Sequence, residues 1–242
     1  MRTLRFYYPG PYLWDAEFEL PAAICRHAVQ VLRLKAGSEI HLFDGVGNEY
    51  LAVLTSVDKR SSWARLERQL AVQNESPLAV TLLQGISRGE RMDYAIQKAV
   101  ELGVSDIVPV VTERCNVSLS AERAEKRHLH WQGVMVAACE QSGRAVLPVL
   151  QSVQPLEEAI HTTKGTCRLV LDPQSGQSMQ ALAKPEAVTL LIGPEGGLSD
   201  REVAQAVEAG FTPIQFGPRV LRTETASAAA LAVVQALWGD LA

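Results

Sequence analysis

Glu195, Arg222 and Glu224 stand in short loops that contain glycine and proline. Glu195 lies within segment 193–199, and Arg222 and Glu224 lie within segment 217–225. Charged side chains in such loops are not needed for folding, so they indicate a functional site. A carboxylate can accept a proton in a reaction, and a guanidinium can stabilise negative charge that develops on a substrate. We therefore place the candidate chemistry in these two loops.

A third loop, at residues 172–176, also follows an expected strand. Ligands of open α/β sheets bind beyond the carboxyl ends of the strands, where all three loops would lie. The glycines at 193, 196 and 197 let backbone groups approach a ligand closely, and Pro194 fixes the entry of the chain into its loop. Tight turns alone would show the same glycines. The charged residues favour a binding site over simple turns.

Several common sites are excluded because their motifs are missing. The chain has neither G-x-x-x-x-G-K-[ST] nor G-x-G-x-x-G, so a phosphate loop and a dinucleotide site are not expected. None of its five histidines lies in the three loops, which argues against a Ser-His-Asp hydrolase. A strand, not a helix, is expected after Asp44-Gly45-Val46-Gly47, so that segment does not bind a cofactor. Four cysteines without a C-x-x-C pair predict reduced thiols and no metal.

A mostly parallel sheet would position the three loops. After residue 77, β-branched runs alternate with helical periodicity, which predicts an α/β domain. The expected strands are 79–86, 106–111, 146–150, 168–171, 188–192 and 213–216. A helix is expected over 90–102 with a stop at Gly103, and another begins at the capping box of Ser199 and Glu202 and ends at Gly210. An Ala-rich helix is expected over 226–238.

The first seventy residues have a different pattern. Alternating runs at 39–43 and 50–54 flank a Gly-rich turn and predict a hairpin. The polar segment 73–77 is a plausible linker. We therefore expect two domains, 1–74 and 75–242.

The composition is that of a globular protein. The chain has 242 residues, with 47% hydrophobic and 21% charged, which argues against disorder and fibrous repeats. Its longest uncharged run is too short and too polar for a membrane span, so no membrane anchor is expected. Residues 1–6 lack an apolar leader with a cleavage site, which predicts a cytoplasmic protein. The net charge is −4, with +1 in residues 1–74 and −5 in residues 75–242, so nucleic acid would be bound by local patches and not by bulk charge.

At this point the sequence resembles a known family, the bacterial 16S ribosomal RNA uracil-N3 methyltransferases of RsmE type, which belong to the SPOUT class. The resemblance rests first on 191–199 and 217–226, which occur as paired loops in this order. Further matching segments are 27–33, 87–90, 97–98, 101–103, 113–115 and 140–144. They cover nearly the whole chain. Phe216 departs from the family pattern, which has a smaller aliphatic residue before Gly217.

The resemblance implies a PUA-like RNA-binding β-barrel over 1–74 and a SPOUT methyltransferase domain over 75–242 with a C-terminal trefoil knot. It implies S-adenosylmethionine as cofactor, no metal, and 16S rRNA in the small ribosomal subunit as partner. It also implies a homodimer with the active site near the subunit interface. The Ala-rich segment 226–238 fits close packing between subunits, although a buried helix within one chain would look the same.

The resemblance also implies roles for individual residues. The catalytic candidates are Arg222, Glu195 and Glu224, because methylation of a uracil nitrogen needs a proton acceptor and a cation. The cofactor-binding candidates are Leu171, Asp172, Gly193, Pro194, Gly196, Gly197, Gly217, Val220, Leu221 and Thr225. The RNA-binding candidates are Arg26, His27, Arg33, Lys35, Arg88, Arg91, Arg114 and Arg144. Two alternatives remain open: a SPOUT enzyme that acts on tRNA or a ribose hydroxyl, and a non-catalytic ribosome-assembly factor.

Overall fold

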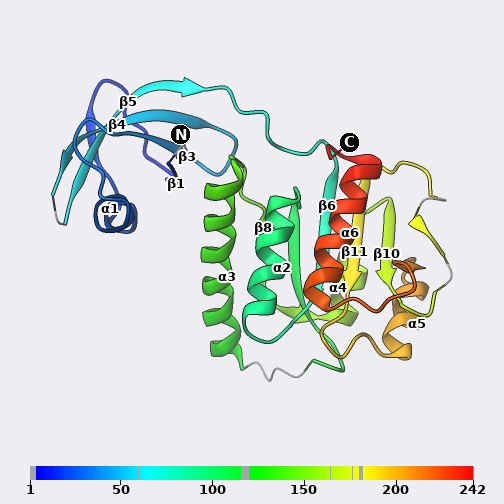
Figure 1. The fold of residues 1–242 in the computed structure, drawn as a ribbon. Coiled ribbons are helices and arrows are strands. Elements are labelled where there is room, and N and C mark those ends of the chain that lie inside the picture. The colour runs from blue at the N-terminus through cyan, green and yellow to red at the C-terminus, as the bar shows by residue number, and fades with distance from the viewer. Residues whose placement is uncertain are drawn as a thin grey trace. The chain divides into compact units, whose positions relative to one another are not determined.

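The structure is a computed structural model and describes residues 4–58, 60–115, 120–163, 165–175, 177–179 and 182–241 (Figure 1). The chain forms two compact units. The first contains residues 4–75 and 139–147, and the second contains residues 76–138 and 148–241. The first unit therefore includes Glu75 and residues 139–147, which the expected boundary after residue 74 placed in the second domain.

The first unit is built on a five-stranded sheet with the order β1-β3-β4-β5-β2. Its elements are β1 (Arg5–Tyr7), β2 (Glu17–Glu19), α1 (Ala22–Cys25), a π-helix (Arg26–Val31), β3 (Glu39–Phe43), β4 (Glu49–Val57) and β5 (Ser62–Leu70). The predicted hairpin is confirmed, since β3 and β4 pair antiparallel with Leu42 opposite Tyr50. Its turn is held by Asp44, whose Oδ1 accepts hydrogen bonds from the Val46 and Asn48 N–H groups. Alternate strand residues such as Ile40, Leu42 and Ala52 are fully buried and form the core.

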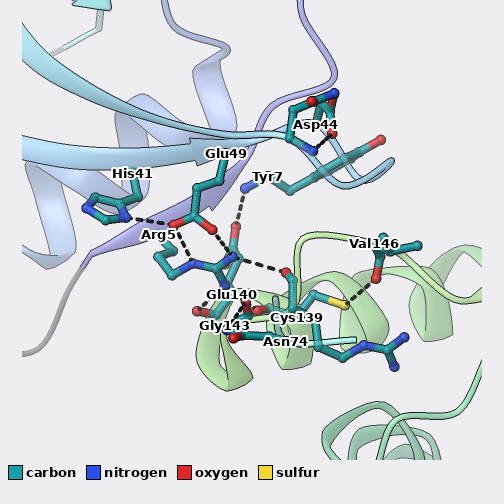
Figure 2. A network of polar contacts seen from close by, with 12 residues as sticks. Arg5, Tyr7, His41, Asp44, Glu49, Asn74, Cys139, Glu140, Gly143 and Val146 are labelled. Carbon is teal, nitrogen blue, oxygen red and sulfur yellow. Dashed lines mark hydrogen bonds and ion pairs between the residues drawn. The ribbon is translucent and has the colours of Figure 1, made fainter. Parts of the chain in front are cut away.

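Charged contacts join residues 139–147 to this sheet (Figure 2). Arg5 pairs with Glu49 at 2.6 Å between Nη2 and Oε2, and its Nη1 donates to the Cys139 carbonyl at 2.7 Å. The Glu140 carboxylate accepts from the Tyr7 N–H. The expected strand 146–150 is therefore partly wrong. Val146 bridges to Gly45 in the first unit, and only Val149–Leu150 (β8) belongs to the sheet of the second unit.

The second unit contains a parallel sheet with the order β12-β10-β11-β6-β7-β8, and β9 pairs with β7. The strands are β6 (Ala79–Gly85), β7 (Asp106–Val111), β8, β9 (Gln154–Pro155), β10 (Cys167–Leu171), β11 (Ala187–Ile192) and β12 (Thr212–Ile214). The expected α/β class with a mostly parallel sheet is confirmed. Because β11 lies between β10 and β6, strands from the end of the chain insert beside the first strand of the unit.

Helices cover both faces of this sheet. The helices of the chain from residue 90 onward are α2 (Glu90–Glu101), α3 (Ala121–Ser142), α4 (Leu156–Thr162), α5 (Asp200–Glu208) and α6 (Thr223–Trp238), of which α3 ends within the first unit. Residues of α4 and α5 pack on the sheet face that carries Leu83 and Leu191. On the opposite face, α2 and α6 lie side by side (Figure 1). One face of the Ala-rich segment is buried within its own chain, where Ala226, Ala230 and Leu231 face the interior.

Local signals identified the starts and stops of α2 and α5, whereas α6 begins three residues before the expected residue 226. The capping box of α5 is present: Ser199 Oγ accepts from the Glu202 N–H at 3.1 Å, and the Glu202 carboxylate accepts from the Ser199 N–H at 2.8 Å. Gly103 and Gly210 follow α2 and α5 with positive φ angles of 75° and 90°. None of the helices in the described part of the chain is long and apolar enough to cross a membrane. The cytoplasmic location stays a prediction.

Candidate functional site

A pocket of about 790 Å³ lies at the carboxyl ends of β10, β11 and β12. All three loops singled out from the sequence contribute to its wall, together with the first turn of α6. Gly176, at the end of the first loop, lies outside the described residues. A pocket at this edge is expected of an open parallel sheet, and its volume suits a ligand larger than an amino acid.

The glycines of the pocket serve two different purposes. A Cβ on Gly193 would lie 2.9 Å from the Gly197 carbonyl carbon, and one on Gly196 would lie 2.9 Å from the Arg114 Cβ. These two glycines are therefore required by packing within the protein. Gly197 and Gly217 have positive φ angles of 69° and 65°, and a Cβ there would meet little or nothing within 4 Å. Only these two leave open space that a ligand can approach.

Glu195 is held by contacts that span 104 and 107 residues of sequence. Its Oε1 accepts from the Arg88 N–H and from Arg91 Nη1, both at 2.9 Å. Burial alone would raise the pKa of Glu195, but these contacts outweigh burial and hold the pKa below its ordinary 4.5. A carboxylate with a lowered pKa is a weak base, so the geometry favours a role in fixing the loop over the expected proton transfer.

Arg114 fixes the same loop from another side. Its Nη1 donates to the carbonyls of Gly196 and Leu198 at 3.2 and 3.0 Å. Arg91 and Arg114, both expected to bind RNA, therefore contact the loop and also line the pocket. The Arg88 side chain is exposed, while its backbone holds Glu195.

Arg222 and Glu224 stand where α6 begins. Arg222 is the exposed N-cap residue, and Glu224 lies in the first turn, where the helix dipole stabilises a negative charge. Both line the pocket. Glu224 Oε2 is buried and has no hydrogen-bond partner within the described part of the chain. Buried oxygens are normally paired, so this oxygen is available to a group that enters the pocket.

Nine of the ten expected cofactor-binding residues line the pocket. They are Leu171, Asp172, Gly193, Pro194, Gly196, Gly197, Gly217, Val220 and Leu221. Thr225 is a correction. It is exposed and does not line the pocket, because Thr223, Glu224 and Ala226 occupy the side of the first helical turn that does. The sequence reading missed Gln215, Phe216 and Arg219, which line the pocket; their positions in the loop after β12 were the available signal.

Arg144 is a second correction. It was expected to bind RNA, but it is only 6% exposed, and its Nη2 pairs with Glu75 Oε2 at 2.7 Å. Its guanidinium is thus used inside the first unit. The other four RNA candidates of this unit, Arg26, His27, Arg33 and Lys35, are exposed. Among the described residues, no group of three His, Cys, Asp or Glu side chains could hold a metal ion.

Two family models match the chain. An RNA methyltransferase domain matches residues 74–235, and an RNA methyltransferase PUA domain matches residues 20–67. The chain is 33% identical to ribosomal RNA small subunit methyltransferase E of Buchnera aphidicola subsp. Schizaphis graminum, over 88% of this chain and 87% of that protein. It is 32% identical to the protein of the same name from Synechocystis sp., over 92% and 74%.

Two solved structures are similar over their full lengths. The ribosomal RNA small subunit methyltransferase E of Neisseria gonorrhoeae, bound to S-adenosyl methionine, is 40% identical with a TM-score of 0.92, and the match covers 100% of both chains. A methyltransferase of Legionella pneumophila in complex with the bound cofactor SAM is also 40% identical, with a TM-score of 0.97 and 100% coverage of both chains.

Proposed function

We propose that the chain transfers a methyl group from S-adenosylmethionine to N3 of a uridine in 16S rRNA. The chain belongs to the RNA methyltransferase family that includes ribosomal RNA small subunit methyltransferase E. The observation that carries this proposal is the pocket itself. The pocket contains two glycines with free space around them, a carboxylate oxygen without a hydrogen-bond partner among the described residues, and an arginine. All of them lie at one edge of a parallel sheet. This combination fits a cofactor and a reacting base in one site.

The residues present fit S-adenosylmethionine. Leu171, Gly193 and Leu221 line the pocket, and Gly197 and Gly217 leave room for close approach. When bound, the cofactor supplies an electrophilic methyl group. Glu195 keeps its negative charge and holds loop 193–199 against Arg88 and Arg91, so the wall of the site is set before ligands enter.

The chemistry at the uracil ring needs a proton acceptor and a stabilising cation. Removal of the N3 proton spreads negative charge onto the neighbouring carbonyl oxygens. In this proposal Arg222 stabilises that charge, because it lines the pocket and has no ion pair within the described part of the chain. Glu224 is the better acceptor of the two carboxylates, because its Oε2 is unpaired whereas Glu195 is bound to two donors.

The first unit would bind the RNA. Arg26, His27, Arg33 and Lys35 are its exposed candidates for phosphate contacts, and the PUA match supports this role. We expect Arg33→Glu to weaken substrate binding about fivefold, more strongly at low salt, with an unchanged affinity for S-adenosylmethionine. Filter binding at two salt concentrations measures this. A defect confined to cofactor binding would contradict the assignment.

The trefoil knot, the homodimer and a cytoplasmic location complete the proposal. The insertion of β11 between β6 and β10 supports the knot, as does the hydrogen bond from Gln215 to the Pro173 carbonyl. Mechanical unfolding should then give an extended length shorter than that of an unknotted chain.

Sedimentation of the protein in solution tests the proposed homodimer. The location follows from a substrate in the small ribosomal subunit.

The decisive experiment measures methyl transfer on two substrates. Small subunits from a strain that lacks the enzyme should accept a methyl group at uridine N3, as detected by nucleoside mass spectrometry. Protein-free rRNA fragments should be poor substrates, because a net charge of −4 gives little non-specific affinity and recognition must depend on shape. No transfer to either substrate by protein that binds the cofactor would overturn the proposed activity.

A further inference from the structure

We infer that Gln84, the penultimate residue of strand β6, is a positioning residue that fixes two walls of the cofactor site to each other. The inference rests on the proposed function, because it concerns the same pocket. Gln84 is fully buried and does not line the pocket. It acts through Gly193 and Thr223, which do line it.

A chain of hydrogen bonds links Gln84 to both walls. Its Nε2 donates to Thr223 Oγ1 at 3.0 Å, and Thr223 Oγ1 donates in turn to the Gly193 carbonyl at 2.7 Å. Gly193 begins the loop after β11, and Thr223 begins α6 just after Arg222. The donors point in one direction along this chain, an arrangement in which each bond strengthens the next.

The other end of the amide is also paired. Gln84 Oε1 accepts a hydrogen bond from Ser227 Oγ, one turn further along α6. The Gly85 carbonyl lies 3.1 Å from Nε2, which fixes the orientation of the amide, since an oxygen at that place would face another oxygen. Gln84 thus contacts two successive turns of α6, at Thr223 and at Ser227.

The surrounding backbone leaves little room for a shift. A Cβ on Gly85 would lie 2.5 Å from the Pro194 nitrogen, so the end of β6 already touches the loop after β11. The neighbours of Gln84 on β6, Leu82 and Leu83, are fully buried and apolar. An apolar residue at 84 would avoid the cost of burying an amide, which suggests that the amide is retained for what it positions.

The chain offers a matched control in Gln235, near the end of α6. Gln235 is also fully buried and does not line the pocket. Its Oε1 accepts from Ser76 Oγ at 2.8 Å, and its Nε2 donates to the Leu102 and Gly103 carbonyls at 3.0 and 3.4 Å. Residue type, burial and number of hydrogen bonds are therefore alike, while the distance from the pocket along the helix is three turns.

The test compares Gln84→Met with Gln235→Met. Both variants remove hydrogen bonds from buried polar partners, so both should lower the melting temperature. Calorimetric titration with S-adenosylmethionine, well below both melting temperatures, should show a Kd raised about tenfold for Gln84→Met and less than twofold for Gln235→Met. In steady state, Gln84→Met should raise the KM for the cofactor more than it lowers kcat.

The outcomes distinguish a role of Gln84 in positioning the cofactor site from a contribution to stability alone. An unchanged Kd and KM for folded Gln84→Met, or an equal loss in Gln235→Met, would overturn the inference and leave the proposed function intact. If Gln84→Met does not fold, Ser227→Ala removes one hydroxyl of the network and should raise the Kd about threefold; an unchanged Kd there also overturns the inference. Failure of the unaltered protein to bind S-adenosylmethionine would instead overturn the proposed function.

Discussion

Arginine–carboxylate contacts occur in both units, but in different surroundings. In the first unit, the side chains of Arg5 and Glu49 are only 7% and 6% exposed. At the pocket, the side chains of Arg91 and Glu195 are 45% and 23% exposed. Breaking a buried pair leaves an uncompensated charge, whereas water screens an exposed one. We therefore expect the first contact to govern stability and the second to govern the geometry of the site.

The largest effect should come from breaking the buried pair. Arg5→Met leaves Glu49 with the His41 side chain as its ion-pair partner and removes the donor to the Cys139 carbonyl. We expect the free energy of unfolding of the first unit to fall by about 3–5 kcal/mol. Urea denaturation followed by tryptophan fluorescence measures it, since Trp14 and Trp63 lie in this unit.

A matched control exists in the same unit. Arg65 pairs with Glu67 at 3.0 Å, but their side chains are 53% and 38% exposed. Arg65→Met should change the free energy of unfolding by no more than about 1 kcal/mol. Equal losses in the two variants would show that burial does not separate the two kinds of contact.

The next largest effect is expected at Arg222, which lines the pocket and has no ion pair within the described part of the chain. Arg222→Ala should lower kcat about 100-fold on saturating substrate, since it removes a cation that stabilises the transition state. Its exposed position predicts an almost unchanged melting temperature. Single-turnover methylation of small subunits measures the rate. A normal rate would remove Arg222 from the chemistry.

A smaller effect is expected at the exposed pair. Glu195→Gln keeps an acceptor for the Arg88 N–H but removes the charge that holds Arg91. We expect the Kd for S-adenosylmethionine to rise about fivefold, with about 0.5 kcal/mol or less lost in stability. Glu113→Gln, which breaks an exposed contact with Arg201 outside the pocket, is the control and should leave the Kd unchanged.

The smallest effect is a dependence on pH. Burial alone would raise the pKa of Glu49, but hydrogen bonds from Arg5 and His41 outweigh it and place the pKa below the ordinary 4.5. The unfolded chain therefore takes up a proton first as the pH falls. The stability due to Glu49 is fully present above about pH 4.5 and is lost as the pH falls toward the lowered pKa.

Denaturation of the first unit at pH 6 and below pH 4.5 measures this loss. Glu49→Gln should make the acid dependence shallower, whereas Glu195→Gln should change it less, because the Glu195 side chain is more exposed. A steeper acid dependence in Glu49→Gln would contradict the lowered pKa.

Local sequence patterns determined most of the elements and the place of the pocket. The hairpin at 39–54, strand 106–111, helix 90–101 and the capping box at Ser199 each depend on residues within one short window. The glycine, proline and charged residues in the loops after the last strands located the site, because they too lie within short windows of sequence. Periodicity and capping act over a few residues, so they can be read without knowledge of the fold.

Only the tertiary structure decided what the individual side chains do. Arg144 meets Glu75 across 69 residues, the Arg88 backbone meets Glu195 across 107, and Gln84 meets Thr223 across 139. Nothing in a local window shows that Arg144 is buried, that Glu195 is held by two donors, or that Gln84 reaches α6. The charge and size of a residue are local properties, but its burial and its partners depend on which distant segments the fold brings beside it.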